Sequence, residues 1–118
     1  MSEDVLYKKS YIGKFSQAIK EAPQFGPAFV TYDHAVFKAG SLDLKTKELI
    51  ALAVAHVTGC PYCIEVHVER FKKMGGSYEE LMEAVSVGAA VTAGGVIGHA
   101  INSYNAFKSQ EAPVDPLR

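Results

Sequence analysis

The chain has 118 residues, of which 48% are hydrophobic and 21% charged, which is enough apolar surface for one compact domain but too little chain for two. Its 12 Lys and Arg nearly balance its 13 Asp and Glu, so it lacks the basic footprint that nucleic-acid binding requires. The longest apolar stretch, taken as residues 49–57, is too short to span a bilayer. The first residues lack the basic and apolar regions of a secretory signal, so we expect a cytoplasmic protein without membrane contact.

Glycine and proline divide the chain into segments of helical length, and no segment shows strand-like alternation. Asp43 is a favourable N-cap and Gly59 a favourable C-terminal residue for a helix between them. Ser77 and Glu80 have the spacing of a capping box. The predicted helices cover residues 4–22, 27–40, 44–58, 61–74, 77–87 and 96–108.

Small residues dominate the segment 88–100, where helix propensity is poor but close helix contacts, within or between subunits, are favoured. The prolines of segment 111–118 predict a loose tail. We therefore expect an all-α, single-domain helical bundle of about six helices over residues 1–118, with its core at about 27–108. Four phenylalanines at helical spacing are its expected core aromatics: Phe15, Phe29, Phe37 and Phe71.

The two cysteines are Cys60 and Cys63, at the predicted start of the fourth helix. In a reducing compartment such a close pair is more often redox-active or metal-binding than a structural link. His67 follows Cys63 by one helical turn, so all three side chains project from one face. A helix N-terminus favours thiolate over thiol, and a histidine one turn away can relay a proton. This set suits peroxide reduction or dithiol exchange.

The spacing leaves open which cysteine attacks. His67 is nearer to Cys63, which favours Cys63 as the nucleophile and Cys60 as the resolving thiol. Cys60 is nearer to the amides of the helix start, and in many such pairs the first cysteine has the lower pKa. Both assignments remain open at this point.

Two segments, 47–54 and 59–67, resemble the carboxymuconolactone decarboxylase family, and in particular its alkylhydroperoxidase D-like branch. That pattern is a glutamate, twelve residues, Cys-x-x-Cys and a histidine four residues further, which here are Glu48, Cys60, Cys63 and His67. A looser resemblance covers about residues 27–95. Tyr62 stands between the cysteines at a position that can hold a histidine.

The resemblance implies a peroxiredoxin-type antioxidant oxidoreductase in which Cys63 is the peroxidatic cysteine and Cys60 resolves it. It implies a proton relay formed by Glu48 and His67, a peroxide substrate and an external dithiol reductant. It also implies an all-helical homo-oligomer, a trimer or hexamer, which needs no prosthetic group or metal.

Two other classes of function remain as alternatives. Family members without the cysteine pair are decarboxylases that act on a lactone, so the fold alone does not decide the substrate. A non-enzymatic redox or metal-binding module is the second alternative, with zinc held by the two cysteines, His67 and either His56 or Glu48. We expect His56 to be structural and Tyr62 to contribute packing or to line a pocket.

Overall fold

The structure, a computed structural model, describes residues 7–117. These residues form helices and loops and contain no strand, which confirms the prediction of an all-α fold with about six helices. In chain order the elements are the 3-10 helix η1 (Lys9–Lys14), then α1 (Phe15–Lys20), α2 (Gly26–Val36), α3 (Leu44–Thr58), α4 (Pro61–Lys73), α5 (Tyr78–Gly98) and α6 (Ala100–Lys108).

The boundaries of α3 and α4 follow from local sequence signals. The carboxylate of Asp43 accepts a hydrogen bond of 2.8 Å from the backbone N–H of Thr46 and so caps α3. Gly59 ends α3 with a φ of 69°, a left-handed conformation that glycine adopts without steric cost. Cys60 is the N-cap of α4, and Pro61 occupies its first turn. The short turn between the two helices makes them neighbours.

The start of α5 is also fixed by side chains. Ser77 and Glu80 form both hydrogen bonds of the predicted capping box. The carboxylate of Glu80 also forms an ion pair of 2.9 Å with Lys45 of α3. The hydrogen bond from Lys45 is the largest of the effects that lower the pKa of Glu80. This pair ties the beginning of α5 to α3.

The core lies between α3, α4 and the start of α5. Leu52 and Phe71 are fully buried, and Ala55 is almost so. A Cβ atom at Gly76 would clash with the ring of Phe71, so no side chain fits at this position. This small core fixes α4 against α3, and so fixes the face of α4 that carries the cysteines.

Three expectations for the first half of the chain need correction. The predicted helix over residues 4–22 is a 3-10 helix followed by a short α1, and its residues 4–6 lie outside the described part. Helix α2 ends at Val36 and not near Gly40, because Phe37 leaves helical geometry. Phe15 and Phe29 are about half exposed, so they are not core residues as predicted, whereas Phe71 is.

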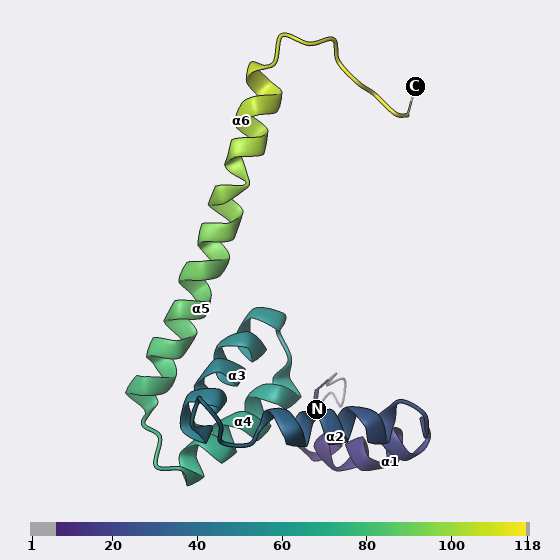
Figure 1. Cartoon of the computed structure of the whole chain (residues 1–118), viewed down its shortest axis with the longest axis vertical. Helices are drawn as coiled ribbons and strands as arrows, with labels where there is room; N and C mark the ends of the chain where they lie inside the picture. Colours follow the sequence, from purple (N-terminus) through teal and green to yellow (C-terminus); the bar gives the residue numbers. More distant parts are fainter. Residues whose placement is uncertain (1–6, 118) are drawn as a thin grey trace, which may run out of the picture.

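Helices α5 and α6 form one long arm that extends away from the rest of the chain (Figure 1). Helix α5 continues through the small residues to Gly98 and α6 begins at Ala100, whereas we expected helices ending near residue 87 and starting again near 96. No Pro interrupts residues 78–108, and no Asp, Glu, Lys or Arg occurs between residues 84 and 107. The expectation that residues 49–57 are the longest apolar stretch is therefore wrong.

Among residues 7–117, the arm is the one helix that is long and apolar enough to cross a membrane by length and composition alone. It covers Tyr78–Lys108, and its most apolar stretch has a mean hydropathy of 1.6 and is not buried within the chain. The core helix of a soluble protein can pass the same test, so length and composition do not decide its surroundings.

Candidate functional site

Cys60 and Cys63 lie at the N-terminus of α4 and are joined by a disulfide, with their Cα atoms 5.3 Å apart. The backbone N–H of Cys63 donates to the sulfur of Cys60 over 3.2 Å. The sulfur of Cys60 therefore takes the place of an N-cap oxygen and faces the positive end of the helix dipole. The two sulfurs are within bonding distance, as the spacing predicts, and a four-residue loop of this kind constrains the unfolded chain little.

Glu48 and His67 form the second part of the site. Nδ1 of His67 lies 2.6 Å from a carboxylate oxygen of Glu48, which joins α4 to α3. Glu48 is only 1% exposed, and burial of a carboxylate is costly unless it is paired and hydrogen-bonded. Arg70 places a guanidinium nitrogen 4.0 Å from its other oxygen. The buried acid thus has a partner at each oxygen.

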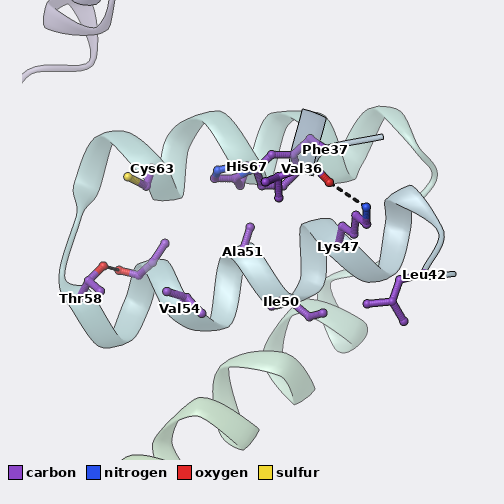
Figure 2. A pocket seen from close by; sticks show the side chains of 11 residues that line it. Val36, Phe37, Leu42, Lys47, Ile50, Ala51, Val54, Thr58, Cys63 and His67 are labelled. Carbon is purple, nitrogen blue, oxygen red and sulfur yellow. Dashed lines mark hydrogen bonds between the residues drawn. The ribbon is translucent and has the colours of Figure 1, made fainter. Parts of the chain in front are cut away.

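An apolar groove of about 430 Å³ is lined by both His67 and Cys63. Figure 2 shows Cys63 and His67 on α4 facing Ala51 and Val54 of α3 across this groove. Cys60 is not among its lining residues. The lining residues are Val36, Phe37, Leu42, Lys47, Ile50, Ala51, Val54, Ala55, Thr58, Cys63 and His67. A molecule in this groove would therefore meet the sulfur of Cys63 and the imidazole together.

The structure also brings to the site three residues that sequence reasoning did not select. Phe37, predicted as a core residue, stacks its ring on the imidazole of His67 with centroids 5.1 Å apart. Arg70 follows His67 by three residues, a helical spacing that could have suggested it. Lys47 and Phe37 come from a different part of the chain, and no local pattern links them to the histidine.

Two residues with uncertain roles now have clear positions. Nδ1 of His56 lies 2.7 Å from the carbonyl oxygen of Leu52 in its own helix, and His56 does not line the groove. Tyr62 packs edge-on against Tyr7, with ring centroids 5.4 Å apart, and it is absent from the groove as well. Within the described part of the chain, no three His, Cys, Asp or Glu side chains are grouped to hold a metal ion.

The hydrogen bond of His67 determines which of its nitrogens is free. An ionised carboxylate only accepts, so Nδ1 carries the proton in the pair with Glu48. The opposite nitrogen, Nε2, then carries the lone pair and can accept a proton. The site therefore contains a buried acid, an imidazole with a fixed tautomer and a thiol pair at a helix start. Together these groups can move one proton and exchange two electrons.

The chain belongs to the carboxymuconolactone decarboxylase family, whose sequence model matches residues 23–104. A curated relative, "Uncharacterized protein 4 in cox locus" of Paracoccus denitrificans, is 45% identical over 91 residues, which cover 74% of this chain and 82% of the relative.

Solved structures agree with this assignment. A protein from Methanobacterium thermoautotrophicum superposes with a TM-score of 0.71 at 28% identity, covering 75% of this chain and 97% of its own. A carboxymuconolactone decarboxylase family protein from Legionella pneumophila, in its apo form, gives 0.63 at 34% identity, over 70% and 79% of the two chains. A family member from Thermotoga maritima, for which a role in antioxidative response has been suggested, gives 0.54 at 37% identity, over 67% and 81%.

Proposed function

We propose that this protein is a thiol-dependent peroxidase of the alkylhydroperoxidase type. The observation that carries the proposal is that the sulfur of Cys63 and the imidazole of His67 line one apolar groove, while Cys60 is already bonded to Cys63. The suggested antioxidative role of the Thermotoga maritima relative supports the same class of activity.

In the proposed cycle the thiolate of Cys63 attacks the terminal oxygen of a hydroperoxide. The O–O bond breaks, Cys63 becomes a sulfenic acid, and the alkoxide takes a proton and leaves as the alcohol. The thiol of Cys60 then condenses with the sulfenic acid, which forms the disulfide and releases water. An external dithiol reduces the disulfide and is itself oxidised to a disulfide, so the electrons balance without a bound cofactor or metal.

The positions of the cysteines favour these roles. Cys63 lines the groove, where a peroxide can reach it, and Cys60 does not. The amide that donates to the sulfur of Cys60 favours its thiolate, the form that attacks a sulfenic acid. His67 takes the proton of the Cys63 thiol and returns it to the leaving alkoxide, while Glu48 stabilises the imidazolium that forms between these steps.

Measurement of peroxide consumption with a dithiol in excess tests the proposal. The wild-type protein should consume an organic hydroperoxide catalytically, and Cys63→Ser should abolish consumption without unfolding the protein. Normal turnover by Cys63→Ser would overturn the assignment. A lactone decarboxylase would retain its activity in the double variant Cys60→Ser/Cys63→Ser, and a metal-binding module would contain stoichiometric metal when purified without added metal.

We also propose that the protein works as a homo-oligomer in the cytoplasm, with the α5–α6 arm as the contact between copies. A compact 12.7 kDa monomer exposes about 6,200 Å², whereas this chain exposes 9595 Å². Its radius of gyration is 20.3 Å, against about 13.5 Å for a compact domain of this length. The difference between the two exposed areas is comparable to the area that obligate subunit interfaces bury.

The composition of the arm favours a second copy as its occupant. Residues 89–108 are exposed along their whole length. Residues 89–107 nevertheless contain no Asp, Glu, Lys or Arg. Ile97, Ile101 and Tyr104 recur at helical spacing and form one apolar stripe. Glycines and alanines on the same helix allow another helix to approach closely, so two arms can pack against each other.

A further inference from the structure

Phe37 lies just beyond the end of α2, and its ring contacts two side chains of α4. It stacks on the imidazole of His67 with an angle of 29° between the ring planes. The guanidinium carbon of Arg70 lies over the same ring, 6.0 Å from its centroid. An aromatic ring offers a flat surface to an imidazole and attracts a cation to its face.

The backbone around Phe37 is fixed from α3. The ammonium group of Lys47 donates to the carbonyl oxygen of Val36 over 2.7 Å and also to that of Lys38. These two residues flank Phe37, so one side chain holds the chain on both sides of the ring. Lys47 immediately precedes Glu48, and the position of the ring is therefore set relative to the carboxylate that binds the histidine.

The hydrogen bond to Glu48 cannot by itself determine where His67 points. The imidazole is attached to α4 through Cβ, and a single hydrogen bond at Nδ1 restrains its two side-chain torsions at one atom only, which leaves the ring able to tilt. Stacking on Phe37 fixes the plane of the ring, and two constraints together fix the direction of Nε2. Proton transfer between Nε2 and a thiol depends steeply on that direction.

We propose that Phe37 is a positioning residue, which orients the imidazole of His67 toward its proton-transfer partner and is itself held by Lys47 and Arg70. This inference rests on the proposed peroxidase function for its kinetic consequence, but the orientation of the imidazole can be measured without it. Arg70, which contacts the Phe37 ring, also lies 4.0 Å from Glu48. The contacts therefore run from Glu48 to His67, Phe37 and Arg70 and back to Glu48.

The test compares Phe37→Leu with Phe29→Leu, a matched change at an exposed position of the preceding helix α2. We expect Phe37→Leu to lower kcat for an organic hydroperoxide by roughly tenfold and to change the pH profile of kcat. Phe37→Tyr, which restores a stacked ring, should recover most of the rate, and Phe29→Leu should behave as the wild type. If KM rises while kcat and its pH profile stay unchanged, Phe37 only lines the groove and the proposal is wrong.

Nitrogen NMR of the His67 ring gives a readout that is independent of activity. The wild-type ring should show one tautomer, with the proton on Nδ1. Phe37→Leu should keep that tautomer, because Glu48 sets it, but its ring signals should broaden because the plane of the ring is no longer held. Arg70→Lys keeps the charge at an exposed position but loses the planar group that lies over the Phe37 ring, so it should also broaden the ring signals. It serves as the second variant if Phe37→Leu does not fold. Ring signals unchanged in every folded variant would overturn the proposal. A wild type with these signals but no peroxidase activity would instead refute the proposed function alone.

Discussion

Nδ1 of His67 and a carboxylate oxygen of Glu48 lie 2.6 Å apart, although the two residues are 19 positions apart in the chain. The pair joins α3 to α4 at the wall of a groove that also exposes the sulfur of Cys63. Glu48 is almost completely buried, so its carboxylate has to be matched inside the protein. The pair therefore contributes to both the packing of the two helices and the chemistry proposed for the groove.

Replacement of Glu48 by glutamine should separate these two contributions. Glutamine retains an oxygen that accepts from Nδ1 of His67, but it carries no charge to stabilise an imidazolium. We expect Glu48→Gln to fold and to react with an organic hydroperoxide about ten- to a hundredfold more slowly. Rapid-mixing measurement of thiol loss, with circular dichroism to monitor folding, checks this result.

Glu69→Gln is the matched control for that variant, because Glu69 is an exposed carboxylate on α4, the helix that carries His67. It should leave the rate unchanged. An unchanged rate in Glu48→Gln as well would show that the buried carboxylate takes no part in the reaction.

The small core makes a clear prediction for stability. Leu52 is fully buried between the helices, so Leu52→Ala should lower the free energy of unfolding by about 2–5 kcal/mol. Leu42→Ala removes the same atoms at a position that is 47% exposed, and it should cost about 0.5 kcal/mol or less. Urea denaturation of both variants measures the difference. Equal losses would mean that the core does not lie where we place it.

The cap of α3 predicts a dependence of stability on pH. The hydrogen bond from the Thr46 backbone holds the pKa of Asp43 below its ordinary value of 3.8. A carboxylate whose pKa is lowered by folding contributes stability above its unfolded pKa and loses it as the pH falls through the folded value. The melting temperature of the wild type should therefore fall more steeply below pH 4 than that of Asp43→Asn, which keeps an accepting oxygen but does not titrate.

Thermal melts between pH 2 and pH 6 give both curves. Parallel curves would contradict a role of the Asp43 charge in capping the helix.

The exposed arm predicts a concentration-dependent or stable oligomer. Light scattering after gel filtration should give a multiple of the 12.7 kDa chain mass, and Ile101→Lys should shift the mass toward the monomer by placing a charge in the apolar stripe. Ser103→Lys, on the opposite side of the same helix, is the control and should leave the mass unchanged. A wild-type monomer at all concentrations, or a protein that requires detergent to stay in solution, would contradict self-association.

Local signals were sufficient to predict the parts of the fold nearest the site. Asp43, Gly59 and the capping box define helix ends through contacts a few residues long, so the sequence predicts them well. The common face of Cys63 and His67 follows from helical spacing alone. The pairing of Glu48 with His67 could be suggested only through the family resemblance, because it joins two helices.

Other features depend on contacts that no local pattern contains. Phe37 reaches the histidine because Lys47 fixes the end of α2, and the sequence gives no sign of that contact. Because Phe37 is a large aromatic residue at helical spacing, we predicted it to be a core residue instead. The glycines in α5 suggested a break, but the segment contains no proline, and packing against a second copy can offset the weak propensity of its residues.

Counting of thiols after a single exposure to peroxide tests the central claim most directly. Fully reduced protein is mixed with one equivalent of an organic hydroperoxide, and free thiols and chain mass are measured before and after. We predict the loss of two thiols per chain, with one intramolecular disulfide between Cys60 and Cys63, whereas Cys60→Ser should stop at a sulfenic acid on Cys63. Retention of both thiols in the wild-type protein would contradict the account.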